Sequence, residues 1–252
     1  MWTRAELKSY AKAKLEYNYW PIVGVTFLVG LIVGITNIEI PVDQLVKLGY
    51  ISDVDALFFL FVNFAISLVG IILGIFLFGP LQVGLARYYI NQETRTSSFK
   101  DLFYPFTHNY WNVVGVLFLQ SLYTILWTLL FIVPGIVKSY EYMMIPYLLA
   151  EKPDLKARDA FAATRRMMDN NKWDAFILRL SFIGWFLLAI LTLCLLFPFF
   201  VEPYCALTHS ELYLALKTRV DYLFDGMDSE EQVVQAEESV QYTYWSPYDE
   251  NQ

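Results

Sequence analysis

The sequence predicts an all-α integral membrane protein, and three observations lead to this fold class. First, the 252 residues are 57% hydrophobic and 18% aromatic, with a mean hydropathy of +0.42, whereas soluble domains are about 45–50% apolar with glycine counted. Second, the apolar residues are gathered in long runs. Third, a unit of an amphipathic stretch, a long apolar run, a turn and a shorter apolar run occurs three times. We therefore expect six transmembrane helices, arranged as three parallel repeats of an amphipathic helix followed by a helical hairpin.

Short motifs that end in tryptophan mark the three copies. NYWPIVGVTFLV starts at Asn18 and NYWNVVGVLFLQ at Asn109, and eight of the twelve positions are identical. A weaker copy, NKWDAFILRL, starts at Asn171. The repeats are expected over about residues 3–90, 96–150 and 154–218.

Charge divides the chain into a membrane domain, residues 1–220, and a tail, residues 221–252. The net charge is −7, but the tail holds nine acidic residues and no Lys or Arg, so residues 1–220 carry +2. The tail has too little apolar area to fold, so we expect an acidic, disordered cytoplasmic segment. It either solubilises that end of the chain or docks on a partner or on the basic helices of its own body.

Each amphipathic stretch places apolar residues on one helical face and cations on the other. In the first, Thr3 and Glu6 fit a capping box. Its apolar face holds Leu7, Tyr10, Ala11 and Leu15, and its basic face holds Arg4, Lys8 and Lys12. Such a helix either lies in the membrane interface, with its cations toward anionic headgroups, or packs on the protein itself.

The expected spans are residues 21–38, 56–79, 112–133, 136–150, 173–197 and 204–216. The fourth is short against the usual ~20 residues. Pro80, Pro134 and Pro203 are expected at the start of the second helix of each hairpin, and Pro80 is expected to kink its span. Gly30 with Gly34, and Gly70 with Gly74, have the small-xxx-small spacing that allows close helix packing.

The distribution of cations predicts the orientation. Most Lys and Arg lie in residues 1–19, 90–110 and 151–172, whereas the loop over residues 37–55 is acidic. The positive-inside rule therefore places both termini in the cytoplasm. Trp20, Trp111 and Trp173 then fall at the cytoplasmic interface, where an indole ring is favourable, and are the expected interface anchors.

Six ionisable residues are the candidate site residues, five inside the expected spans and Glu202 just before the last span, because charge is costly in a bilayer. They are Lys138, Glu141, Arg179, Glu202, His209 and Glu211. The spacing of Lys138 and Glu141 predicts a mutual ion pair, and Arg179 needs a partner such as Glu141, Glu202 or Glu211. The set is interpreted as structural pairing, as a substrate or ion path, or as catalytic groups.

Motifs for enzymes and metals are missing from the sequence. It has no HExxH, GxSxG, GxxxxGK[ST] or dinucleotide-binding glycine pattern. His209 and Glu211 are two residues apart, so they face different sides of a helix and do not form a metal site. Cys194 and Cys205 are read as small buried residues, although they could pair. We expect no enzyme activity, no cofactor, no metal and no nucleic acid partner.

Three stretches resemble a known family. They are GIVKSYEYMMIPYLLAEKPDLKARDAF, LSFIGWFLL from Leu180 and PYCALTHSELY from Pro203. They are similar, in the same order, to the bacterial integral-membrane family called domain of unknown function 975. More distantly, the chain resembles the membrane domain of glycerophosphodiester phosphodiesterases, whose catalytic barrel it lacks. The resemblance implies a multi-pass protein of the bacterial plasma membrane and brings no catalytic residues.

Three functions are compatible with these features. The first is a non-enzymatic membrane scaffold or accessory protein that binds anionic lipid headgroups through its basic helices, or a membrane-protein partner or second copy. The second is a small-solute or lipid transporter or channel, in which Lys138, Glu141, Arg179 and Glu211 face one polar cavity. The third is a lipid-modifying enzyme with His209 in a polar pocket open to the inner leaflet.

Overall fold

The structure, a computed structural model, describes residues 2–35, 52–192 and 196–218 and the single positions 46, 48 and 220. All regular structure within these residues is helical, which confirms the all-α class. The helices are α1 (Arg4–Tyr17), α2 (Tyr19–Ile35), α4 (Asp53–Leu73), α5 (Gly79–Ile90), α6 (Tyr104–Thr107), α7 (Tyr110–Leu130), α8 (Ile132–Tyr142), α9 (Ile145–Glu151), α10 (Ala157–Met168), α11 (Lys172–Leu180), α12 (Ile183–Leu191) and α13 (Glu202–Lys217). Two π-helices, η1 (Gly74–Phe78) and η3 (Phe197–Val201), and a 3-10 helix, η2 (Phe99–Phe103), complete the set.

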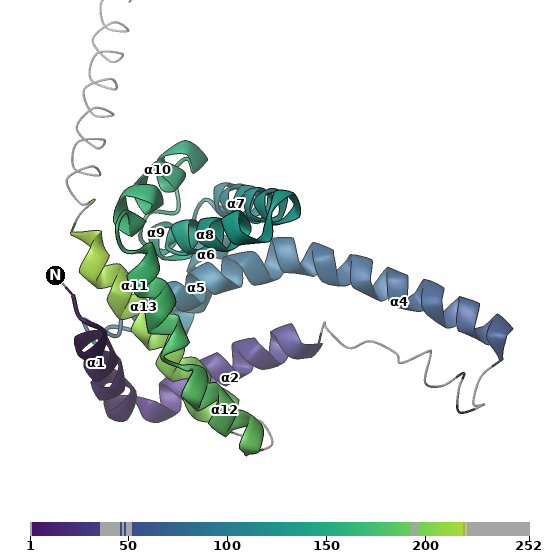
Figure 1. The fold of residues 1–252 in the computed structure, drawn as a ribbon, viewed down its shortest axis with the longest axis horizontal. Helices are drawn as coiled ribbons and strands as arrows, with labels where there is room; N and C mark the ends of the chain where they lie inside the picture. The colour runs from purple at the N-terminus through teal and green to yellow at the C-terminus, as the bar shows by residue number, and fades with distance from the viewer. Residues whose placement is uncertain are drawn as a thin grey trace, which may run out of the picture.

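Helices α5, α9 and α13 pack together and form the centre of the fold (Figure 1). α5 contacts both of the others, and Tyr147 of α9 stacks on Tyr213 of α13 with ring centroids 5.4 Å apart. A proline lies in the first turn of each helix: Pro80, Pro146 and Pro203. Proline fits this position because its missing N–H would have no partner inside the helix.

A different amphipathic segment covers each of the three central helices. η2 packs on α5, α10 packs on α8 and α9, and α1 packs on α13. η2 follows α5 in the chain and covers it, and α10 follows α9 and covers it. α1, at the start of the chain, covers α13 near its end. The apolar face of α1 is therefore inside the protein: Leu7, Ala11 and Leu15 are at most 3% exposed. Of the two alternatives given for this helix, packing on the protein itself holds for these three residues, whereas Tyr10 of the same expected face is exposed.

Three helices are long and apolar enough to cross a membrane: Leu57–Ile90, Tyr110–Leu130 and Lys172–Leu191. A fourth candidate joins α1 to α2 across a bend of 99°. The most apolar 18-residue window of Leu57–Ile90 has no buried residue, and α4 projects away from the other helices (Figure 1). These lengths give three or four candidate spans among the described residues, against the six that we expect from the sequence.

The fourth expected span, residues 136–150, is not one helix. The chain turns at Phe131, α8 runs antiparallel to the end of α7 and ends at Tyr142, and a turn at Met143 and Met144 leads into α9. Pro134 lies in the first turn of α8, while the proline equivalent to Pro80 and Pro203 is Pro146. Just before Pro80 the long helix contains the π-helix η1, and Pro80 lies in the first turn of α5.

At three of the four glycines expected to allow close packing, the described residues leave open space. A Cβ atom on Gly30, Gly34 or Gly74 would meet no heavy atom within 4 Å among the described residues. On Gly84 it would lie 2.1 Å from the carbonyl oxygen of Leu102, and on Gly135 2.3 Å from Oγ1 of Thr128. Glycine is thus required where η2 meets α5 and where α8 meets α7. Most of the acidic loop and all of the tail lie outside the described residues.

The tryptophan motifs lie at the start of three helices. Trp20, Trp111 and Trp173 are each the second residue of their helix, in α2, α7 and α11. They are 76%, 73% and 70% exposed. Asn109, just before α7, has a φ of 48°, a left-handed conformation that asparagine adopts more readily than most residues.

We predict that Gly84→Ala and Gly135→Ala destabilise the fold by about 1–3 kcal/mol, because the added methyl group overlaps Leu102 or Thr128. The measurement is the midpoint of thermal unfolding of the purified protein in detergent. Gly115→Ala in α7 is the control, since its Cβ would meet no described atom within 4 Å and alanine favours helix. Equal midpoints for all three variants would contradict the close packing.

Candidate functional site

Glu141 lies at the centre of a group of cations that comes from three helices. Its side chain is 5% exposed, near the end of α8. Lys138 Nζ lies 2.7 Å from Oε1, Arg165 Nε of α10 lies 3.1 Å from Oε1, and Lys172 Nζ of α11 lies 2.5 Å from Oε2. We call these four residues the Glu141 cluster. The ion pair expected between Lys138 and Glu141 is confirmed, and two further cations join it.

The end of α8 and helix α10 hold the cluster together. The hydroxyl of Thr164, next to Arg165, donates a hydrogen bond of 2.8 Å to the backbone oxygen of Glu141. A hydrogen bond to Tyr142 and the nearby Glu141 carboxylate raise the pKa of Arg165. Ending α8 at Tyr142 thus brings the carboxylate within reach of α10 and α11, which the straight helix expected over residues 136–150 would not allow.

The Glu141 cluster has a net charge of +2. Its carboxylate is buried, whereas the side chains of Lys138, Lys172 and Arg165 are 24%, 35% and 59% exposed. Arg158 and Arg166 on the same helix as Arg165 are also exposed. A buried anion that fixes exposed cations makes a surface that attracts a phosphate or carboxylate group. Lys172 was not identified from the sequence, because its partner is 31 residues away.

Arg179 and Glu202 are both exposed and lie within electrostatic range of each other. The partner that Arg179 is expected to need therefore stays a prediction. His209 is half-buried in α13 and also lies within electrostatic range of Arg179. Cys205 of the same helix is a half-buried free thiol, and Cys194 lies outside the described residues.

Glu211 belongs to a different contact, between α1 and α13. Lys14 Nζ of α1 lies 2.5 Å from Glu211 Oε1 and also pairs with Glu93, which follows α5. Glu211 is 7% exposed. Its ion pair with Lys14 therefore helps to hold α1 against α13, and it is not part of the Glu141 cluster.

Two further contacts tie the ends of the central helices. Glu151 of α9 accepts a hydrogen bond of 2.7 Å from the hydroxyl of Tyr213 and pairs with Lys217 at 2.8 Å, both on α13. Arg87 of α5 donates a hydrogen bond of 2.6 Å to the backbone oxygen of Ala150 in α9. Polar groups thus link α5 to α9 and α9 to α13 at their C-terminal ends.

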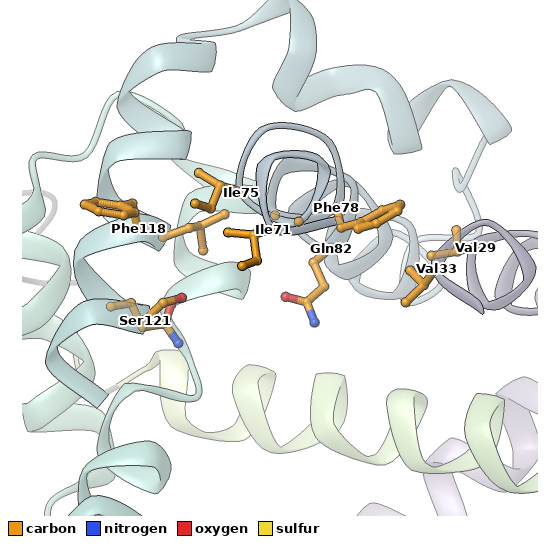
Figure 2. A pocket seen from close by; sticks show the side chains of 12 residues that line it. Val29, Val33, Ile71, Ile75, Phe78, Gln82, Phe118 and Ser121 are labelled. Atoms are coloured by element: carbon orange, nitrogen blue, oxygen red, sulfur yellow. The ribbon is translucent and has the colours of Figure 1, made fainter. Parts of the chain in front are cut away.

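A cavity of about 320 Å³ lies between three helices. Its walls are α2, α7 and the long helix formed by α4, η1 and α5. Gln82, Gln120 and Ser121 are its polar residues, and the others are apolar. Figure 2 shows the side-chain amide of Gln82 projecting into the space between Ser121 and Val33. None of the six candidate residues from the sequence lines this cavity.

The described residues form an all-helical protein in which several helices are long and apolar enough to cross a membrane. Residues 132–220 match the family model described as "Protein of unknown function (DUF975)", which confirms the resemblance over that stretch. It contains the whole Glu141 cluster. The comparisons with curated proteins and with solved structures found no match. The resemblance to the membrane domain of glycerophosphodiester phosphodiesterases stays a prediction from sequence.

We predict that Glu141→Gln lowers the free energy of unfolding by about 1.5–3 kcal/mol, the range for hydrogen bonds to charged groups. Without the carboxylate, three cations repel one another and α10 loses contacts to α8. The measurement is the thermal midpoint in detergent. Glu16→Gln is the matched control, because its ion pair with Lys12 is exposed and contributes little. A shift no larger than that of the control would contradict a structural role for the cluster.

Proposed function

We propose that the chain is a six-span, multi-pass protein of the bacterial plasma membrane built from three hairpin repeats, and that it acts as a non-enzymatic scaffold or accessory protein. It binds anionic lipid headgroups. It also binds a membrane-protein partner or a second copy of itself, either directly or through these lipids. The observation that carries the proposal is the Glu141 cluster, where a buried carboxylate holds three partly exposed cations.

Three equivalent features support the repeats. Pro80, Pro146 and Pro203 begin the central helices, and the tryptophans of α2, α7 and α11 occupy the same place in their helices. The amphipathic segments cover the central helices in a closed cycle. Three hairpins related by a pseudo-threefold axis along the membrane normal explain these features together.

The cytoplasmic location of both termini is supported by the distribution of cations. The segments over residues 1–19, 90–110 and 151–172, which include α1 and α10, carry 12 of the 18 Lys and Arg residues of the chain. In this orientation the C-terminal ends of α5, α9 and α13 face the cytoplasm, and α10 lies at the inner leaflet. That leaflet is rich in anionic lipid, so its negative headgroups attract the net charge of +2 on the Glu141 cluster.

A transporter or channel is the second candidate function, and one observation argues against it. Lys138 and Glu141 bind each other, whereas Glu211 is held by Lys14 on another helix pair. Glu211 lines a cavity of about 320 Å³ together with Glu6 and Glu93, but Lys138, Glu141 and Arg179 do not line it. Lys138 with Glu141, and Glu211 with Lys14, thus form separate ion pairs, and the four residues do not line this cavity together, which favours the scaffold. An enzyme would need His209 in a cavity. Neither the cavity of Figure 2 nor the cavity beside Glu211 includes it.

We predict that the double variant Arg165→Gln, Arg166→Gln binds phosphatidylglycerol roughly thirtyfold more weakly, because each of the two cations near an anionic surface contributes about 1 kcal/mol. Native mass spectrometry of the purified protein, titrated with phosphatidylglycerol and with phosphatidylcholine, measures the difference. The control is Lys12→Gln, Lys100→Gln, which removes the same charge away from α10. An equal loss in the control would show that net charge alone attracts the lipid, and would contradict a site on α10.

We predict that proteoliposomes containing the wild-type protein show no ion flux above that of empty vesicles, and that Glu141→Gln leaves this unchanged. The physical reason is that the ionisable residues are paired between helices and do not line one path. A flux that disappears in Glu141→Gln would contradict the scaffold and favour the transporter.

A further inference from the structure

Helix α10 presents three arginines on its exposed side. Arg158 and Arg166 are exposed, and neither forms an ion pair with any of the described residues. Arg165 is held by Glu141, but its side chain is 59% exposed. Residues 158 and 165 are seven positions apart, so they share one face of the helix, and Arg166 lies beside them. We call these three residues the α10 arginines. One segment with several carboxylates would be able to contact all of them.

The cations of the other amphipathic helix, α1, are mostly in use. Lys12 and Lys14 form ion pairs with carboxylates, and Lys8 Nζ lies 4.2 Å from the centre of the Phe182 ring. Among the described residues, the cavity between α1 and α13 is lined by three carboxylates and by no Lys or Arg: Glu6, Glu93 and Glu211. An acidic segment is therefore attracted to α10 more strongly than to α1.

The acidic tail, residues 221–252, begins beside α10. Val220, the last described residue, is 0% exposed and belongs to the same buried cluster as Met167 and Met168 of α10. Its backbone N–H donates a hydrogen bond of 2.8 Å to the oxygen of Lys217, and α13 contacts α10. Each residue extends a chain by at most about 3.5 Å, and α10 is only about 18 Å long. A few residues after Val220 are thus enough to reach the α10 arginines.

The acidic residues of the tail are concentrated near this fixed end. Residues 225–238 hold six Asp and Glu in fourteen positions, and no Lys or Arg occurs after residue 220. Arginine and carboxylate pair through two parallel hydrogen bonds. Exposed ion pairs are individually weak. A segment joined to its site by a short linker, however, has an effective concentration in the millimolar range, which favours binding within one chain.

We propose that residues 225–238 dock on the α10 arginines of the same chain and compete there with anionic lipid headgroups. The carboxylates of the segment contact Arg158, Arg166 and the exposed side of Arg165. The competition rests on the lipid binding proposed above, whereas the docking does not. The contact is electrostatic and lies at the surface, so it weakens as the salt concentration is raised.

Cross-linking without added lipid tests the docking. The full-length protein in detergent, with Cys194 and Cys205 replaced by serine, carries Ser229→Cys together with either Ala162→Cys on α10 or Ala5→Cys on α1. Both alanines are exposed, so the second pair is the matched control. A short bis-maleimide is added, and the cross-linked peptides are measured by mass spectrometry.

We expect roughly fivefold more cross-linking to the α10 position than to the α1 position, the gain from a few surface ion pairs. The preference is expected to disappear at about 1 M salt, where the Debye length is about 3 Å. Equal cross-linking at low salt overturns the docking.

Lipid binding tests the competition. Replacing the six carboxylates by amides is expected to raise phosphatidylglycerol binding about fivefold, measured by native mass spectrometry, because the arginines are released. The same tail change is then made in Arg158→Gln, Arg166→Gln, which keeps Arg165 and the Glu141 cluster, and there the expected rise is less than about twofold. An equal rise in both backgrounds shows that net charge alone is responsible and overturns the competition. The six substitutions are Asp225→Asn, Asp228→Asn, Glu230→Gln, Glu231→Gln, Glu237→Gln and Glu238→Gln.

The remaining outcomes separate this proposal from the earlier one. If Arg165→Gln, Arg166→Gln leaves phosphatidylglycerol binding unchanged, the lipid site and the competition are both wrong, and the cross-linking preference still decides whether the tail docks. A cross-linking preference without any change in lipid binding in the tail variant overturns the competition alone. If the cross-links to Ala162→Cys join two chains, seen as a dimer on a denaturing gel, the tail docks on a second copy and docking within one chain is wrong.

Discussion

The mutual packing of α5, α9 and α13 is the interaction on which the rest of the structure depends. α9 has only seven residues, whereas α5 is the end of the long helix Leu57–Ile90. A helix as short as α9 is not stable alone, so its stability comes from packing on α5 and from the segment α10 that covers it. Because η2, α10 and α1 each cover one central helix, removing any of them exposes part of the shared core.

Buried charge follows from the same arrangement. The amphipathic helices α1 and α10 carry Lys14 and Arg165, and their packing brings these cations close to Glu211 on α13 and Glu141 on α8. Lys138 and Lys172 complete the partners of Glu141. A buried carboxylate without a partner would cost several kcal/mol, so the two pairs also fix where α1 and α10 lie. Only the Glu141 cluster keeps an excess of positive charge, which distinguishes it as the candidate binding surface.

Much of this arrangement could be predicted from local sequence patterns. The all-α class and the start of the three tryptophan helices followed from composition and from the Asn-x-Trp motifs. The pairing of Lys138 with Glu141 followed from their spacing on one helix. These features are encoded within a few residues of each other, which is why single-sequence reasoning finds them.

Other features depend on contacts that the local pattern does not contain. The apolar run over residues 136–150 reads as continuous, and only the packing of α9 on α5 shows why it breaks at Met143. Leu7 and Leu15 look like a membrane-facing stripe until α13, about 200 residues later, covers them. The polar groups of the cavity, such as Gln82 and Gln120, lie on separate helices. Sequence reasoning passed over them because uncharged amides carry no obvious signal in an apolar run.

The measurement that tests the central claim most directly is the membrane side on which the three tryptophan positions lie. Trp20→Cys, Trp111→Cys and Trp173→Cys are made one at a time with Cys194 and Cys205 replaced by serine. A membrane-impermeant maleimide is then added to intact cells and to inverted vesicles. Three parallel hairpins predict labelling of all three positions from the cytoplasmic side only. Labelling of any one of them from the external side would contradict the account.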